Sequence, residues 1–208
     1  MITSRLLSEH GRTYAEDAGI TLRDKPAPLY QLLVLTVLCA IRIKSDTATA
    51  AARELFRAGL RTPRAMADSD WQDRVNALGR ARYVRYDEST ATALGDGAQL
   101  VLDRWHGDLR RMQEDADGDL NALRDLLQEI PRIGPVGTDI FCREAQAVWP
   151  QLRPFFDDRA CGTARDLGLP HTPRGLGDLV PPTDHARLAA ALVRVSLSKD
   201  AAKELQAA

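Results

Sequence analysis

The sequence predicts a small all-α protein. Helix signals recur along the whole chain, with Pro, Ser, Thr or Asp before many apolar segments and Gly after many of them. No segment alternates apolar and polar residues convincingly in the way that a half-buried strand does. A chain of 208 residues with 44% hydrophobic residues can bury a sizeable core, so we expect one domain or two small helical lobes.

The expected helices follow one another with brief loops. In chain order they cover residues 4–18, 29–41, 46–59, 63 onward, 70–79, 83–105, 119–129, 136–148, 159–167, 173 onward and 183–197. Side-chain caps are expected at Ser45 or Asp46, at Thr62, at Ser69 with Gln72 completing a capping box, and at Asp119. Gly95 and Gly97 weaken the middle of the helix over residues 83–105.

Composition excludes several classes of protein. The three cysteines and four histidines are scattered, without a CxxC pair or ligand spacing, so no metal site is expected. The longest apolar run, residues 29–43, is interrupted by polar residues and too short to span a bilayer. The N-terminus lacks an apolar signal segment, and we expect a cytoplasmic protein.

One stretch suits the binding of an anion. Residues 130–141 read IPRIGPVGTDIF, a tight turn between two expected helices in which Gly134 is free to adopt a positive φ. The amides after the turn begin a helix, where unpaired N–H groups and the helix dipole favour a phosphate. The alternative is a helix–turn–helix corner that needs glycine only for packing.

A carboxylate follows this turn along the chain. Asp157 comes after an apolar Pro-Phe-Phe segment and stands at the start of the helix expected over residues 159–167. Asp is a favoured N-cap, so a purely structural role is one interpretation. The other role is chemical, because an ionised carboxylate stabilises a sugar that develops positive charge and orients an attacking water.

These two stretches, in this order and spacing, resemble the helix-hairpin-helix superfamily of DNA glycosylases, which includes endonuclease III. That family shows Leu-Pro-Gly-Val-Gly before a helix, then Val-Asp-Thr-His and a helix that ends in Arg-Leu-Gly-Leu. The counterparts here are residues 130–134, with Arg132 in place of the first glycine, then Phe156-Asp157 and residues 167–169. This alignment makes Asp157 the counterpart of the catalytic aspartate and leaves Asp158 as the runner-up.

The resemblance implies two helical lobes with a DNA cleft between them. Residues 26–137 would form a six-helix-barrel-like lobe with the hairpin, and residues 1–25 and 138–208 a second lobe built from both chain ends. The implied partner is double-stranded DNA with a damaged or mismatched base, and the implied activity is hydrolysis of the N-glycosidic bond in base-excision repair. The expected DNA-binding residues are Arg42, Arg132, Ile133, Gly134, Pro135, Val136 and Gly137.

The sequence departs from the family pattern at several positions, and these differences restrict the activity that the resemblance implies. Lyase members carry a lysine two residues after the last hairpin glycine, and Val136 stands there instead, so a monofunctional glycosylase is expected. The cysteines of the family's iron–sulfur cluster are absent, so no cofactor is expected. The family's Gln at the end of the first buried helix is replaced around Ile41-Arg42, which makes Arg42 either a residue that fills the gap of a flipped base or a surface arginine.

Aromatic residues leave further alternatives open. Residues 79–86 interleave Arg with Tyr, and they either contact DNA or place arginine stems over buried tyrosines. Trp149, Phe155 and Phe156 are expected in the core rather than in a base pocket. Two other functions compete with the glycosylase: a non-catalytic protein that binds DNA lesions or structures, and a helical interaction module without a nucleic-acid role.

Overall fold

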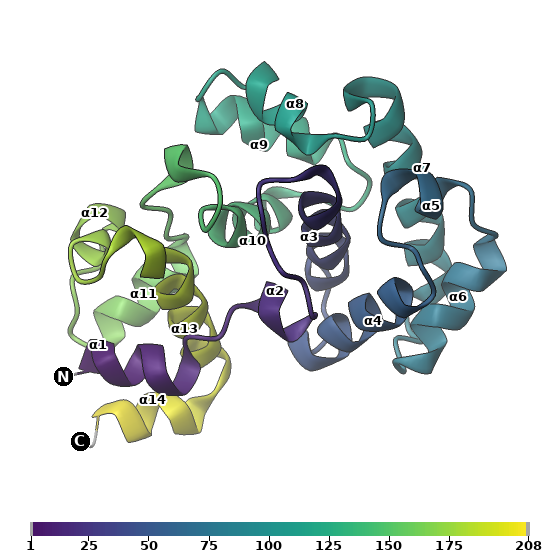
Figure 1. Cartoon of the computed structure of the whole chain (residues 1–208). Helices are drawn as coiled ribbons and strands as arrows, with labels where there is room; N and C mark the ends of the chain where they lie inside the picture. The colour runs from purple at the N-terminus through teal and green to yellow at the C-terminus, as the bar shows by residue number, and fades with distance from the viewer. Residues whose placement is uncertain (1, 207–208) are drawn as a thin grey trace. The chain divides into compact units, whose positions relative to one another are not determined.

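The computed structural model describes residues 2–206, and every regular element in that range is a helix (Figure 1). The all-α fold class is therefore confirmed for these residues. The chain forms two compact units, and each is described by itself. Unit 2 is the continuous segment Ala15–Phe141, and unit 1 combines the residues before it with those after it. The lobe boundaries implied by the family resemblance stay a prediction.

One apolar helix forms the centre of unit 2. The helices of this unit are α3 (Pro26–Cys39), α4 (Ser45–Arg57), α5 (Pro63–Ala67), α6 (Trp71–Arg80), α7 (Asp87–Trp105), α8 (Leu109–Asp115) and α9 (Leu120–Gln128). Proline at the first position starts α3, since its missing N–H is not needed there. The helix is buried from Leu29 to Leu38 except at Gln31, and it packs against α4, α7 and α8.

The capping predictions are partly confirmed. The Thr62 side chain accepts a hydrogen bond from the amide of Ala65, and the Asp119 side chain caps α9. The cap expected at Ser45 or Asp46 is wrong, because α4 begins at Ser45 and its N-cap, Lys44, forms no side-chain cap. The structure also contains α8 and α14 (Lys199–Gln206), two short helices that the sequence patterns did not indicate.

The capping box expected at Ser69 is wrong because Ser69 serves a buried arginine. The N-cap of α6 is Asp70, and the hydroxyl of Ser69 donates to the carbonyl of Met66 at 2.7 Å. Arg74 in α6 is only 7% exposed. Its Nη1 donates to the Met66 carbonyl and to both oxygens of Ser69, while its Nε donates to the Ala91 carbonyl. Arg74 thus ties the end of α5 to α6 and α7.

Three expected helices differ from the observed ones. The helix expected over residues 29–41 already begins at Pro26. Residues 4–18 form α1 (Ile2–Arg5), a π-helix η1 (Leu6–His10) and, after a break, α2 (Tyr14–Asp17). The break follows Gly11, whose backbone lies so close to η1 that a Cβ there would be 2.3 Å from the Leu7 carbonyl oxygen. The helix expected over residues 83–105 begins only at Asp87.

Unit 1 joins the two ends of the chain. It contains α11 (Asp158–Asp166), α12 (Pro173–Gly177), α13 (His185–Leu197) and α14, the short 3-10 turns η2 (Pro150–Leu152) and η3 (Pro182–Asp184), and the N-terminal α1 and η1. Helix α13 is its buried centre and packs against α11 and η1. From α13, Arg187 donates to the carbonyls of Leu7 and Gly11, and Arg194 donates to that of Arg12.

Candidate functional site

The hairpin of unit 2 is a tight turn built around Pro131 and Arg132. The amide of Ile133 donates to the carbonyl of Ile130 at 3.0 Å, with Pro131 in the position that fixes the first turn angle. Arg132 follows with φ of 69°, which is the left-handed conformation of a type II turn. The expectation of a positive φ at Gly134 is therefore wrong, since Arg132 is the left-handed residue of this turn.

Gly134 instead precedes the helix that leaves the turn. Helix α10 (Pro135–Ala145) starts directly after it, and the amide of Thr138 donates to the Gly134 carbonyl at 3.0 Å. The N–H groups of Val136 and Gly137 come before this first bond, so the helix offers them no acceptor. The Val136 side chain is 64% exposed. The helix start therefore carries two N–H groups without a helical acceptor, of which that of Gly137 belongs to a buried residue, and a Cβ at Gly134 would meet no heavy atom within 4 Å.

Close packing explains Gly137, in the first turn of α10. A Cβ at Gly137 would lie 3.0 Å from Cγ2 of Ile133 and 3.5 Å from Cβ of Ala40. The residue that follows α3 thus contacts the start of α10. The exposed Arg42 lies two residues beyond Ala40, so the loop that carries Arg42 begins beside the first turn of α10.

A second loop with a left-handed arginine lies near Arg132. Helix α6 ends with the amides of Arg82 and Tyr83 donating to the carbonyls of Gly79 and Leu78, and Arg82 has φ of 58°. Tyr83 is fully buried, so it is not available to stack on a base, and the interpretation as a buried tyrosine is correct for this residue. Burial raises the pKa of Tyr83 to about 12, and the nearby charge of Arg132 opposes that shift.

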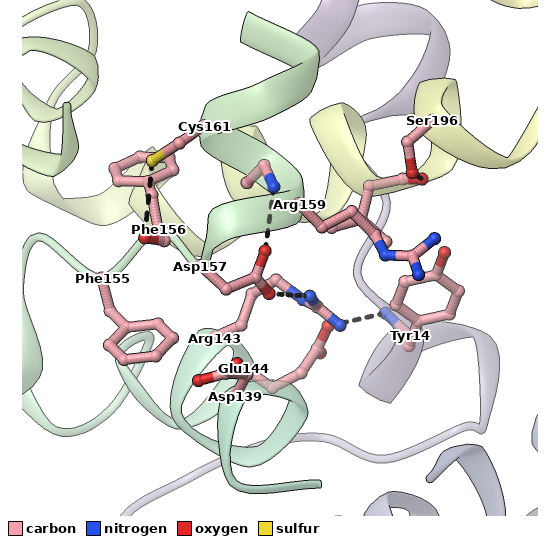
Figure 2. A network of polar contacts seen from close by, with 12 residues as sticks. Tyr14, Asp139, Arg143, Glu144, Phe155, Phe156, Asp157, Arg159, Cys161 and Ser196 are labelled. Carbon is pink, nitrogen blue, oxygen red and sulfur yellow. Dashed lines mark hydrogen bonds and ion pairs between the residues drawn. The ribbon is translucent and has the colours of Figure 1, made fainter. Parts of the chain in front are cut away.

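Asp157 is both a helix cap and half of a buried ion pair. Its Oδ1 accepts a hydrogen bond from the amide of Ala160 at 2.9 Å, which caps α11 (Figure 2). Its Oδ2 accepts from Nη1 of Arg143, and both side chains are only 5% exposed. The neighbouring Asp158, by contrast, is exposed. The N-cap interpretation of Asp157 is thus correct as to structure, and the ion pair is an additional finding.

The side chain of Gln146 fixes the segment before Asp157. The buried amide of Gln146 donates to the Phe155 carbonyl at 2.8 Å and accepts from the Phe155 amide at 3.0 Å. Trp149, Phe155 and Phe156 are buried, as the sequence indicates. Arg143 and Gln146, at and just after the end of α10, therefore hold the residues that lead into α11.

Arg143 and Gln146 were not predicted from the sequence as site residues. Arg143 and Glu144 are adjacent charged residues in a helix that is otherwise largely apolar, and both are buried. Buried charges need partners, so this pair was a usable signal of a polar network. Glu144 accepts a hydrogen bond from the amide of Tyr14, which the sequence did not indicate.

Over residues 2–206, no group of three or more His, Cys, Asp or Glu side chains is arranged to hold a metal ion. No helix in the same range has the length and apolar character needed to cross a bilayer.

The fold is that of endonuclease III. The chain is similar to endonuclease III trapped with DNA as a covalent intermediate in an estranged-adenine complex, with 14% identity, a TM-score of 0.54, and coverage of 92% of this chain and 83% of that one. A non-covalent endonuclease III–DNA complex is similar at 16% identity, a TM-score of 0.54, and 91% and 81% coverage. No protein-family model and no curated protein matches the chain. At these identities the likeness establishes the fold alone.

Proposed function

We propose that this protein is a monofunctional DNA glycosylase that hydrolyses the N-glycosidic bond of a damaged or mismatched base. The observation that carries the proposal is the placement of Asp157. In a chain with the endonuclease III fold, this carboxylate stands at the start of α11 and is fixed through both of its oxygens. Asp158 remains the runner-up because it is adjacent and exposed.

The hairpin would bind the DNA backbone. A phosphate accepts hydrogen bonds from amides at a helix start, where the helix dipole also favours an anion. The proposed contact residues are Arg132, Ile133, Gly134, Pro135, Val136 and Gly137, with Arg42 from the loop that begins beside Gly137. The left-handed Arg132 supports this role, because a glycine would satisfy the turn with less strain but would supply no charge.

Asp157 would act on the sugar of a nucleotide turned out of the duplex. As the bond from C1′ to the base breaks, the base leaves with the bonding electrons and C1′ gains positive charge. The carboxylate stabilises this charge and orients a water molecule, whose oxygen forms the new bond to C1′. The water proton replaces the lost bond on the departing base, and the products are a free base and an abasic site.

The absence of an amine at residue 136 supports hydrolysis without strand cleavage. A lyase forms a Schiff base through a lysine, and a valine side chain has no nucleophilic atom. Val136 is largely exposed at the first turn of α10, so it would present an apolar surface at that point.

Base release from a panel of duplexes tests the proposal. Each duplex carries one lesion or mismatch and is treated with hot alkali after incubation, since alkali cuts any abasic site. We expect strand cuts at one class of lesion after alkali and none without it. If a folded protein leaves every duplex intact after alkali, the glycosylase proposal is wrong.

One observation favours a second candidate function, the binding of damaged or distorted DNA without catalysis. The guanidinium of Arg143 already compensates the charge of Asp157, which reduces what the carboxylate can offer a cationic sugar. The same panel separates the two functions. A binder would retain lesion duplexes in a gel-shift assay and release no base.

A further inference from the structure

The buried contact between Arg143 and Asp157 differs from the other buried arginine contact described above. Arg74 donates through Nε and Nη1 to backbone carbonyls and to a hydroxyl. Arg143 is 4% exposed, and its Nη1 is directed at the carboxylate of Asp157. Its buried Nε has no hydrogen-bond partner among the described residues. Arg143 is therefore committed to one carboxylate rather than to the backbone.

Several contacts restrict the position of this carboxylate. The amide of Ala160 holds one oxygen and Arg143 holds the other, so rotation about the Cβ–Cγ bond would break both contacts. The Gln146 amide holds the backbone two residues earlier through both its donor and its acceptor. Each carboxylate oxygen has a second lone pair, so a held carboxylate can still act on another group.

The ion pair should persist when the protein binds DNA. Both side chains are 5% exposed, and separating two buried charges leaves each without compensation in an apolar environment. A conformational release of Asp157 is thus less favourable than action by the paired carboxylate. Buried partners that fix the rotamer of a reacting group are the usual way to keep it in a productive geometry.

We propose that Arg143 is a positioning residue for Asp157, whose carboxylate it holds oriented toward the sugar. The proposal rests on the proposed glycosylase function and adds a residue that the hairpin and aspartate motifs do not contain. Arg143 touches neither the base nor the sugar in this account. Its effect reaches the reaction only through the carboxylate.

The test compares three variants on a duplex that the wild-type protein processes. Arg143→Met removes the charge and the hydrogen bond to Asp157, and Arg143→Lys keeps the charge but loses the planar guanidinium. Arg187→Met is the matched control, because Arg187 also lies in unit 1 and pairs with a carboxylate, that of Asp184, at 2.9 Å. Melting temperature, DNA affinity and single-turnover base release are measured for each variant.

We expect Arg143→Met to lose about a hundredfold in single-turnover rate, the cost of a misplaced catalytic group, while DNA affinity is unchanged. Arg143→Lys should restore part of that rate. Arg187→Met should lose stability but keep the rate per folded molecule. This pattern separates positioning from a purely structural role, which would lower the melting temperature of both Met variants and leave both rates intact.

Other outcomes overturn the proposal. A folded Arg143→Met protein with wild-type or faster base release would mean that Arg143 does not position Asp157 or that it restrains the reaction. If Arg143→Met does not fold, Arg143→Lys decides, and a wild-type rate in that variant rejects orientation by the guanidinium. If the wild-type protein releases no base from any duplex, the glycosylase function fails and this proposal fails with it.

Discussion

Gly95 leaves the space that the guanidinium of Arg74 occupies. A Cβ at residue 95 would lie 2.8 Å from Nη2 of Arg74 and 3.1 Å from its Cζ. The guanidinium cannot easily move aside, because its Nε and Nη1 are bonded to Ala91, Met66 and Ser69. A glycine that looks unfavourable in the middle of α7 is therefore required by a residue of α6.

Gly95→Ala should destabilise the protein in spite of the better helix propensity of alanine. Overpacking costs about 1–3 kcal/mol, and the propensity gain is at most about 1 kcal/mol. Chemical denaturation measures the change in the free energy of unfolding. In the background of Arg74→Met the same alanine should cost much less, and equal costs in both backgrounds would contradict the contact.

Arg132→Gly should change stability and DNA affinity in opposite directions. Removal of the left-handed arginine relieves up to about 1 kcal/mol of backbone strain, whereas the lost charge weakens binding. The slope of binding against salt should fall by about one unit. Arg82→Gly, at φ of 58°, is a matched control for the gain in stability. A lower melting temperature in Arg132→Gly would show that the arginine makes contacts that outweigh the strain.

Gly134→Val should weaken the binding of all duplexes alike. The space around residue 134 is open in the protein, so the side chain should not unfold it but would obstruct a phosphate at the hairpin amides. Affinity is measured over a series of salt concentrations. Gly137→Ala, which would press on Ile133 at 3.0 Å, should instead lower the melting temperature. Undiminished DNA affinity in a folded Gly134→Val protein would reject the phosphate site.

Asp157→Asn should reduce base release by at least about a hundredfold, the lower range for the loss of an important electrostatic group. DNA affinity should survive. The variant should also lose stability, by up to roughly 3–5 kcal/mol, because the charge of Arg143 stays buried without compensation. Asp158→Asn, at an exposed position, should change neither base release nor stability much. Full single-turnover activity in Asp157→Asn would show that another carboxylate acts.

Borohydride should fail to trap the protein on damaged DNA. Trapping requires a Schiff base between an amine and C1′, and Val136 supplies none at the start of α10. The substitution Val136→Lys places an amine at this position, since the exposed site accepts a long side chain. Efficient trapping of the wild-type protein would mean that another amine serves and that the enzyme is not monofunctional.

Sequence patterns predicted the helices better than the turns. Helix-forming segments and the caps at Thr62 and Asp119 depend on neighbouring residues, which the sequence displays directly. The error at Gly134 came from assigning positive φ to a glycine, whereas Arg132 occupies the left-handed position of the turn. An arginine in that conformation could not be expected from residue preferences.

The candidate site was predicted only as far as its local motifs extend. The hairpin and Asp157 are short patterns, and each could be named from the chain alone. Arg143 contacts Asp157 across 14 residues and a change of direction between two helices, so no period or spacing links them. The hydrogen bonds of Gln146 to the Phe155 backbone could not be predicted from the sequence either, because an amide side chain shows no preference for a particular backbone partner.

The arginines of α13 have a consequence for the order in which the two units can fold during synthesis. Arg187 and Arg194 bond to carbonyls of residues 7–12, at separations of 176 to 182 residues along the chain. A ribosome releases the whole of unit 2 before it has synthesised α13, so unit 2 can fold while the N-terminal π-helix still lacks the helix that covers it. Until then the buried side chain of Leu6 is exposed on the nascent chain. Unit 1 therefore cannot be completed until α13 has been made, and the N-terminal segment lacks these partners until then.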